Sequence, residues 1–466
     1  ATAASAVIRN KTLIEAEEKL VEGLHAQLVP VIRAGDLASP VLYKVAADAT
    51  VAESVRLLNR YRVNALPVED GRRIIGALTR QLADMALHHG LGDRAVRDVI
   101  SGETEPISPD VDLDTVKRRL LGGADRFVLV GEGPGAVEGI ITRTALLRDL
   151  EEGERDGAAA RGVTPGRTVE GEDLSGMLTR RLPGDTVALL RAVGETADED
   201  GSAAYLVGGV VRDLMLRHPI RDLDVVVEGD AGRVARLLGE RLDAEIHVHD
   251  AFQTAVLFTA AGRRLDLATA RTEHYPSPAA LPEVVPGVLR QDLYRRDFTI
   301  NTLAVRLNPR DFGRLLDYFH GRRDLQAGKI RVLHGLSFIE DPTRAYRAVR
   351  FAVRLGFEIS RESEHLVRVA LRERVFDRLS PERLRREVER IFSEKPLVRA
   401  VHLLQQHGLL AVLHPGLRPT RTTYKRLERA EEALGWYRLL YRDEDDEIEG
   451  WVVGLGVVAE KLDEPS

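Results

Sequence analysis

The 466-residue sequence contains no cysteine, three methionines and few aromatic residues, which make up 5% of the chain. Without cysteine, disulfides, thiol catalysis and cysteinyl zinc sites are excluded, and this usage favours a reducing, cytoplasmic location. No apolar run approaches the roughly 20 residues that a membrane helix needs, so no membrane partner is expected. No signal peptide is expected either, and because the chain begins with Ala1 rather than Met we interpret it as a piece of a longer protein.

The sequence contains 67 Lys and Arg and 73 Asp and Glu, which gives a net charge of -6. Neither sign of charge is therefore in large excess. A globally basic protein is thereby excluded, so any RNA would be held by a local basic patch. Arginine does concentrate locally: residues 341–390 contain thirteen Arg against nine acids, whereas residues 421–466 contain seven basic and twelve acidic side chains. The first region is the expected RNA contact, although solvated helix faces would account for many of these arginines individually.

An internal repeat occupies the first third of the chain. A helix, an apolar strand, a glycine-containing turn, an apolar strand and Thr-Arg occur twice, about sixty residues apart, and such repeats pack against each other. The arrangement resembles a tandem pair of cystathionine-β-synthase (CBS) domains over 34–152. Leu82 and Ala145 stand where nucleotide-binding members commonly carry a ribose-binding Asp. The resemblance therefore implies scaffolding, or a homodimer formed through the pair, rather than adenine-nucleotide sensing.

The strongest chemical signal is a strand that ends at Gly208-Gly209, a helix that carries Arg212, and a strand entered by Asp222-Leu-Asp224. Two glycines let backbone N–H groups approach a polyphosphate at a helix start. The two aspartates are two residues apart and so project to one face of the sheet, an arrangement that suits Mg²⁺. A Gly-Gly turn alone, or Asp-x-Asp alone, is more often structural, but their ordered combination is far more specific.

Three further polar blocks lie in apolar surroundings downstream. In the last of them, Asp341 precedes Pro342, which is a typical helix start. Asp341 and Arg344 then share one face of the first turn, where an acceptor and a donor could read the edge of a nucleobase; the alternative is an intrahelical ion pair. The blocks are Asp292–Asn301, Asp317–Leu325 and Phe338–Phe351.

In this order, the motifs resemble those of the class II tRNA nucleotidyltransferase and bacterial poly(A) polymerase family, with further agreement at Ser380–Glu387, a helix-capping element. The resemblance covers about 183–415. It implies two-metal nucleotidyl transfer, with Mg²⁺ held by Asp222 and Asp224 and a further catalytic carboxylate at Asp266. The nucleotide-binding residues that it implies are Gly208, Gly209 and Arg212 for the triphosphate, Arg296, Asp297 and Asn301 for the sugar, Asp341 and Arg344 for the base, and Arg347 beside them.

Several activities occur in this family, and the residues alone leave them open. A full-length, proline-rich segment between Asp266 and Asp292 disfavours addition of CC only, because CC-adding members tend to have a shortened loop there. By analogy of architecture, the CBS pair favours addition of the terminal A to the tRNA 3′ end from ATP. Full CCA addition, polyadenylation and a non-catalytic module that binds RNA or nucleotide are the alternatives, in that order.

The fold class expected is α+β, with tandem CBS domains of βαββα type, a nucleotidyltransferase head with a mixed sheet, and an all-helical neck and body. A linker rich in Gly, Glu, Arg and Ala should separate the CBS pair from the head. The expected boundaries are 1–33 for a helical lead-in, 34–93 and 94–152 for the CBS domains, 153–182 for the linker, 183–333 for the head, 334–400 for the neck, and 401–466 for a body that we expect to be reduced or truncated.

Overall fold

The structure is a computed structural model, and it falls into two compact units, which are described separately. The smaller unit comprises Ala1–Leu42, Thr104–Leu121 and Asp125–Val163, and the larger one comprises the rest. The expected lead-in at 1–33, except Arg33, and most of the expected linker lie outside the described residues. Described are residues 33–460 and 462, apart from 41–42, 62, 72, 101–105, 118, 121–126, 134–135, 143–171, 221, 250–252, 261, 275–278, 280–282 and 441–447.

The smaller unit contains one copy of the repeat. Its three-stranded sheet has the order β1-β6-β5, with β5 and β6 forming an antiparallel hairpin. Apolar side chains on one face of this hairpin, such as Val128 and Ile141, are buried against helical residues such as Val116. The elements are α2 (Ala34–Leu37), β1 (Ser39–Pro40), α5 (Leu113–Lys117), β5 (Phe127–Gly131) and β6 (Val137–Thr142).

The larger unit begins with the other copy, which has the same order of helix and hairpin. The antiparallel pair β3 and β4 carries a register shift between Val68 and Glu69, as the β5–β6 hairpin of the smaller unit does between Val130 and Gly131. The predicted repeat and the CBS fold of this region are thus confirmed. The elements are β2 (Val45–Ala46), α3 (Val51–Tyr61), β3 (Ala65–Asp70), β4 (Arg73–Thr79), α4 (Arg80–His88) and the short η1 (Val96–Asp98).

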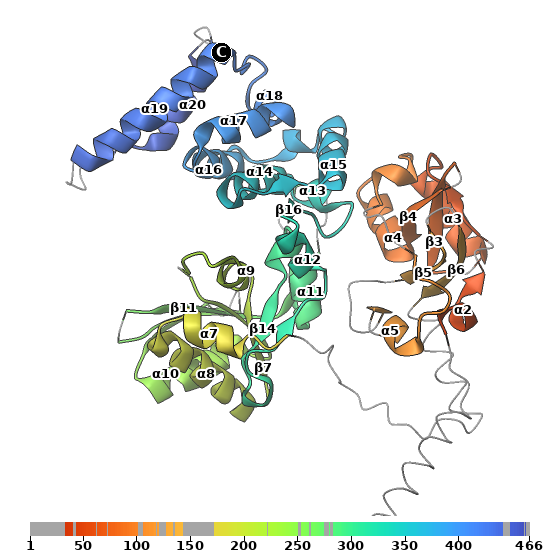
Figure 1. Cartoon of the computed structure of the whole chain (residues 1–466), viewed down its shortest axis with the longest axis horizontal. Helices are drawn as coiled ribbons and strands as arrows, with labels where there is room; N and C mark the ends of the chain where they lie inside the picture. Colours follow the sequence, from red (N-terminus) through yellow and green to blue (C-terminus); the bar gives the residue numbers. More distant parts are fainter. Residues whose placement is uncertain are drawn as a thin grey trace, which may run out of the picture. The chain divides into compact units, whose positions relative to one another are not determined.

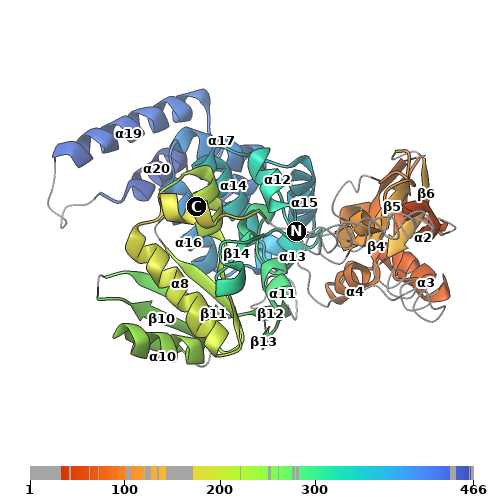
Figure 2. The same ribbon diagram turned by 60° about the horizontal axis from the view of Figure 1, so that its bottom comes forward.

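The head is built on a seven-stranded mixed sheet with the order β15-β14-β7-β8-β11-β10-β9. Only β8 and β11 run parallel, and every other pairing in this sheet is antiparallel. Helices α8 and α10 cover one face (Figure 2). The elements are α8 (Gly184–Glu199), β7 (Ala203–Val207), α9 (Gly209–Leu216), β8 (Asp224–Glu228), α10 (Ala231–Leu242), β9 (Glu245–His249), β10 (Thr254–Phe258), β11 (Arg264–Thr269), β14 (Ala304–Arg306) and β15 (Leu315–Leu316).

Local sequence explains why the central strands form. Val225, Val226 and Val227 make β8 a continuous run of β-branched residues, and all three are buried because both faces of the sheet are covered. At Gly194 on α8, a Cβ would lie 1.8 Å from the Leu307 carbonyl oxygen, so glycine permits the helix to approach the chain closely. The mixed sheet expected from the sequence is confirmed.

The head begins earlier than its first predicted strand. Residues at the end of the segment expected to be a linker form helix α7 (Ser175–Arg181), and Leu174 and Leu178 are fully buried. The Leu174 N–H donates to the carbonyl of Gly313, which ties this segment to the sheet edge. The two leucines are spaced at helical distance, a signal too short to outweigh the glycine-rich composition before it.

Smaller elements connect the head to the helical region: β12 (Arg271–His274), β13 (Glu283–Pro286), α11 (Leu289–Tyr294), η4 (Thr299–Asn301), α12 (Gly321–Gln326) and β16 (Lys329–Ile330). Helices then follow to the end of the described chain, as expected, except that Glu358–Ile359 forms β17 and pairs with β16. The helices, shown in Figure 1, are α13 (Ser337–Glu340), α14 (Thr343–Leu355), α15 (Arg361–Arg372), η6 (Val375–Arg378), α16 (Pro381–Phe392), α17 (Leu397–Gln406), α18 (Leu409–Leu413), α19 (Arg421–Leu440) and α20 (Gly450–Ala459). Within the described ranges, no helix has both the length and the apolarity to cross a membrane.

Candidate active site

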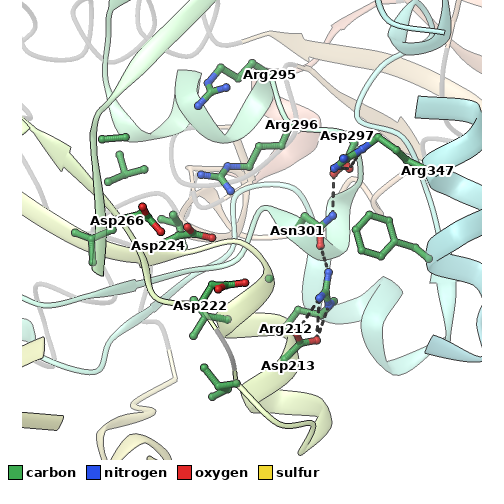
Figure 3. A pocket seen from close by; sticks show the side chains of 18 of the residues that line it. Arg212, Asp213, Asp222, Asp224, Asp266, Arg295, Arg296, Asp297, Asn301 and Arg347 are labelled. Atoms are coloured by element: carbon green, nitrogen blue, oxygen red, sulfur yellow. Dashed lines mark hydrogen bonds and ion pairs between the residues drawn. The ribbon is translucent and has the colours of Figure 1, made fainter. Parts of the chain in front are cut away.

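A cavity of about 1210 Å³ lies where the head meets the neck helices, entirely within the larger unit. It draws together motifs that are far apart in the chain, with lining residues from Val207 to Glu394. Of the predicted site residues, all but Gly208 line it: Gly209, Arg212, Asp222, Asp224, Asp266, Arg296, Asp297, Asn301, Asp341, Arg344 and Arg347. Figure 3 shows part of this wall, with three carboxylates on one side and a chain of paired polar groups on the other.

The three carboxylates come from neighbouring strands. Asp224 is the first residue of β8, and Asp222 precedes it on the other side of the buried Leu223, so both project in the same direction. Asp266 is the register partner of Asp224 on the parallel strand β11. Its carboxylate also accepts a hydrogen bond of 2.9 Å from Arg264. Parallel pairing thus places Asp266 beside the predicted metal-binding pair, as Figure 3 shows.

The electrostatics of this cluster fit a bound cation. Surrounding protein atoms displace water from the Asp224 carboxylate and, together with the negative charges of Asp266 and Asp222, raise its pKa, while Arg296 opposes this shift. Clustered like charges of this kind are stabilised when a divalent cation lies between them. Among the described residues, no group of three or more His, Asp or Glu side chains forms a ready-made metal site. A two-carboxylate set suits Mg²⁺, which fills the rest of its shell with water and substrate phosphates.

A glycine bend faces these carboxylates. Gly208 ends β7 with φ 74° and ψ −133°, a conformation that is essentially restricted to glycine, and α9 begins at the next residue. A Cβ at Gly208 would lie 2.6 Å from Nη1 of Arg296, so the guanidinium packs directly against the bend. The positive charge of Arg296 also opposes the rise in the pKa of Asp224, so it acts on the carboxylates as well as packing against the bend. An anionic polyphosphate would be attracted to this position.

Asp292 fixes the arginines of this wall, a role that sequence reasoning did not assign. Its carboxylate is fully buried and accepts hydrogen bonds from Arg295 at 2.7 Å and from Arg296 at 3.1 Å. Glu273 on β12 accepts from Arg295 at 2.7 Å. The available signal was local, because an acid three and four residues before two arginines can reach both along one face of a helix.

A chain of buried hydrogen bonds connects α9 of the head to α14 of the neck. Arg212 is only 3% exposed and donates two hydrogen bonds of 2.9 Å to Asp213 and another of 2.5 Å to Asn301. Asn301 donates to Asp297 at 2.8 Å, and Arg347 pairs with the other oxygen of Asp297 at 2.9 Å. Figure 3 follows this chain from Asp213 to Arg347. Four of its members, Arg212, Asn301, Asp297 and Arg347, were predicted to contact nucleotide, and in the structure they bind one another.

Asp297 is ionised within this chain. Burial alone would favour its neutral form, but Arg347 and the hydrogen bonds from Asn301 and Arg347, with Arg344 beyond, hold the pKa of Asp297 below its usual range. The same burial lowers the pKa of Arg212, although the adjacent Asp213 counteracts it. The charges of this network therefore compensate one another. Removal of one partner would leave the charge of another buried and unpaired.

The predicted base-reading pair lies at the start of α14. Asp341 accepts hydrogen bonds from the hydroxyl of Thr343 at 2.6 Å and from Arg383 of α16 at 2.8 Å. Arg344 donates to the backbone carbonyl of Arg295 at 2.7 Å. Both side chains line the cavity. Asp341 is oriented by Arg383 of the Ser380–Glu387 motif, and Arg344 is oriented by Arg295 of the Asp292–Asn301 block. Ser380 caps α16 by accepting from the Arg383 N–H, as predicted for the fifth motif.

Residues of the block Asp317–Leu325 pack against the block Asp292–Asn301 and hold it in place. Asp317 accepts hydrogen bonds from the N–H groups of Gly321 and Arg322 and so caps α12. A Cβ at Gly321 would lie 2.3 Å from the Thr299 carbonyl oxygen, and Asp324 accepts from the Thr299 hydroxyl at 2.7 Å. This packing fixes η4, which carries Asn301. Phe298 and Phe319, the phenylalanines of these two blocks, are both buried and so belong to the core.

The site thus combines a glycine bend at a helix start with strand carboxylates and arginines at one cavity. Comparisons with known proteins agree. Three family models match the chain: "Poly A polymerase head domain" at residues 204–331, "Probable RNA and SrmB- binding site of polymerase A" at 356–420, and "CBS domain" at 34–81.

Curated relatives and solved structures match over larger parts. An A-adding tRNA nucleotidyltransferase of Geobacter sulfurreducens is 40% identical over 97% of this chain and 51% of its own length, so the chain spans about half of that relative. An apo CCA-adding enzyme is 38% identical with a TM-score of 0.59, covering 64% of this chain and 69% of the other. A Thermotoga maritima CCA-adding enzyme complexed with tRNA is 36% identical with a TM-score of 0.55, covering 64% and 68%. The chain belongs to the tRNA nucleotidyltransferase and poly(A) polymerase family.

Proposed function

We propose that the protein adds the terminal A to the 3′ end of tRNA, using ATP and releasing pyrophosphate. The observation that carries this proposal is the juxtaposition of Asp222, Asp224 and Asp266 with the Gly208 bend and Arg296 at one cavity. Two A-adding tRNA nucleotidyltransferases, of Geobacter sulfurreducens and Aquifex aeolicus, are 40% and 39% identical to the chain over 97% and 55% of its length. These relatives support A addition over the other activities of the family.

The residues present suggest how transfer would proceed. Asp222 and Asp224 would hold Mg²⁺, which when bound acidifies the attacking 3′-hydroxyl and neutralises charge on the α-phosphate. The Gly208 N–H donates to the Leu303 carbonyl, so the Gly209 N–H and the guanidinium of Arg296 would bind the triphosphate and orient the α-phosphate for in-line attack. Pyrophosphate then leaves on the side of the cavity that carries these donors.

The remaining predicted residues would select and place the nucleoside. Asp341 accepts and Arg344 donates, so together they could hydrogen-bond the edge of an incoming base. Asn301 and Asp297 would contact the ribose from the buried chain that Arg212 and Arg347 hold in place. That chain joins head to neck, so its main contribution would be to fix the width of the cavity between phosphate site and base site.

Three alternatives lead to different products. A complete CCA-adding enzyme would also incorporate C onto shortened tRNA, and a solved CCA-adding enzyme with ATP, 36% identical and with a TM-score of 0.57, gives this candidate specific support. A poly(A) polymerase would extend generic RNA by many residues. A non-catalytic module would bind nucleotide or RNA without incorporating it.

The test offers labelled ATP and CTP separately to tRNAs that lack A, CA or CCA. The proposal predicts a single A on tRNA ending in CC and no C on any substrate. Asp222→Ala should abolish incorporation while circular dichroism and unfolding stay close to wild type. Glu240→Ala, which removes an exposed acid on α10 away from the cavity, serves as the matched control and should retain activity. Turnover near wild type in the Asp222 variant would reject the metal assignment.

The homodimer expected through the CBS pair stays a prediction. Sedimentation of the chain over a range of protein concentrations tests it, and a monomer at every concentration would contradict it.

A further inference from the structure

The CBS repeat of the larger unit, which is the first of the two repeats in the chain, packs against the helical neck. Asp98 of η1 accepts a hydrogen bond of 2.6 Å from Arg372, and Arg94 donates one of 2.7 Å to Glu373, both at the end of α15. A Cβ at Gly335 would lie 1.7 Å from the Val99 carbonyl oxygen, so the two backbones are in close contact. All of these residues lie in the same compact unit as the head. The repeat therefore packs on the helical neck, whose helix α14 lines the cavity.

At the centre of this contact, a histidine of the repeat reaches a buried carboxylate of the neck. His89 follows α4, and its Nε2 lies 3.7 Å from Oε1 of Glu340, the last residue of α13. Nε2 of His334 lies 3.4 Å from the other carboxylate oxygen. The side chains of His89 and Glu340 are only 2% and 9% exposed. Such a contact is shielded from salt and solvent, unlike the ion pairs at the rim of the same interface.

Glu340 depends on these partners to stay charged. Burial favours its neutral form, yet His334 and His89, with Arg344, hold the pKa of Glu340 below its usual range. A buried carboxylate that loses one partner is strongly destabilised in its position, because its charge is left less compensated. Removal of His89 should therefore shift the Glu340 side chain and the backbone that carries it.

The backbone that would shift carries the predicted base-reading pair. Glu340 directly precedes Asp341, and the Arg344 N–H donates to the Asp341 carbonyl at 3.1 Å in the first turn of α14. The charge of Arg344 also acts on Glu340. On the opposite side, the ring of His334 packs against Tyr294 of α11, at 5.1 Å between centroids. Glu340 thus contacts the CBS repeat through His89 and directly precedes the predicted base-reading pair in the chain.

We propose that His89 is a positioning residue for base selection: through Glu340, the first CBS repeat fixes Asp341 and Arg344 in the cavity. This inference rests on the proposed function and deepens it. According to this inference, the CBS repeat contributes to nucleotide selection without binding a ligand itself. The sequence contained no signal for it, because His89 and Glu340 are separated by 250 residues and meet only through tertiary packing.

The test measures kcat and KM for ATP and CTP on tRNA ending in CC. His89→Ala should raise the KM for ATP by about fivefold or more, and lower the preference for ATP over CTP, with a smaller change in kcat. His89→Gln keeps a donor at the position of Nε2 and should restore most of both. Glu340→Gln should reproduce the alanine phenotype, and the double variant should be no worse than the more affected single one.

Arg94→Ala is the matched control, because it weakens the same interface at its exposed rim without contacting Glu340. Unchanged ATP preference in His89→Ala, an equal loss in Arg94→Ala, or additive effects in the double variant would each overturn the proposal. If the wild-type protein incorporates no nucleotide at all, the proposed function fails. Equilibrium binding of ATP and CTP to the same variants then decides the role of His89, and equal affinities in wild type and His89→Ala would overturn it.

Discussion

Substitution of Gly208 by alanine tests the geometry of the phosphate site most directly. Two separate penalties are expected. The backbone, at φ 74° and ψ −133°, would become strained by about 1–3 kcal/mol in a residue with a Cβ. The new Cβ would also lie 2.6 Å from Nη1 of Arg296 and would push the guanidinium away.

A glycine with a positive φ and open surroundings serves as the reference for backbone strain alone. Gly201 has the same φ of 74°, but nothing lies within 4 Å of the Cβ that it lacks, so Gly201→Ala should lose only about 1–2 kcal/mol from backbone strain. If Arg296 leaves Asp292, its 3.1 Å hydrogen bond to a buried carboxylate is lost as well. Gly208→Ala should then be less stable than Gly201→Ala by roughly 1.5–3 kcal/mol.

Urea unfolding of the three proteins gives the stability difference, and nucleotide incorporation gives the functional one. Gly208→Ala should raise the KM for ATP strongly, whereas Gly201→Ala should leave it near wild type. At Gly209 an added Cβ would be 3.4 Å from Nη2 of Arg212, so alanine there should change the free energy of unfolding by no more than about 0.5 kcal/mol. Equal losses of stability at 208 and 201, with ATP binding intact, would refute the assigned contact between Arg296 and the bend.

Two further predictions concern charge. Asp297→Asn should lower the free energy of unfolding at neutral pH by roughly 3–5 kcal/mol because Arg347 loses its buried partner. Folding lowers the pKa of Asp297. The difference in free energy of unfolding between wild type and this variant should therefore be complete above about pH 4 and shrink as the pH falls through the folded pKa. Unfolding at several pH values would show this. The pKa of Asp224 is raised, so Asp224→Asn should stabilise the metal-free protein at neutral pH, by an amount that shrinks on acidification. Added Mg²⁺ should stabilise the wild type and not this variant; stabilisation of both by Mg²⁺, or a pH-independent difference at Asp297, would contradict the assignments.

Local pattern was enough to predict the elements that carry the chemistry. The run of valines after Asp224 identifies a buried strand, and Gly208-Gly209 identifies the bend, because both depend on neighbours in sequence. The helical neck and body also follow from periodicity, apart from the two-residue β17, whose pairing with β16 is a tertiary contact.

The partners of the buried polar side chains are set by tertiary packing, and the local sequence pattern did not reveal them. The side chain of Arg212 was expected to face a triphosphate, but the buried oxygens of Asp213 and Asn301 are its partners, and Asn301 is 89 residues away. The motif therefore identifies a charged side chain but does not reveal which group of opposite charge that side chain pairs with. His89 is the extreme case, since only folding brings it to Glu340.

The parallel pairing of β8 with β11 has a consequence for how this sheet can vary. The chain between the two strands makes an excursion through α10, β9 and β10 and returns to hydrogen-bond beside its point of departure. The separation of Asp224 from Asp266 is thus set by the spacing of adjacent strands and not by the length of the excursion. Growth or loss of residues at the outer edge, beyond β9, would leave the distance between the acidic side chains unchanged, so this margin is where the head can be remodelled without disturbing its reactive centre.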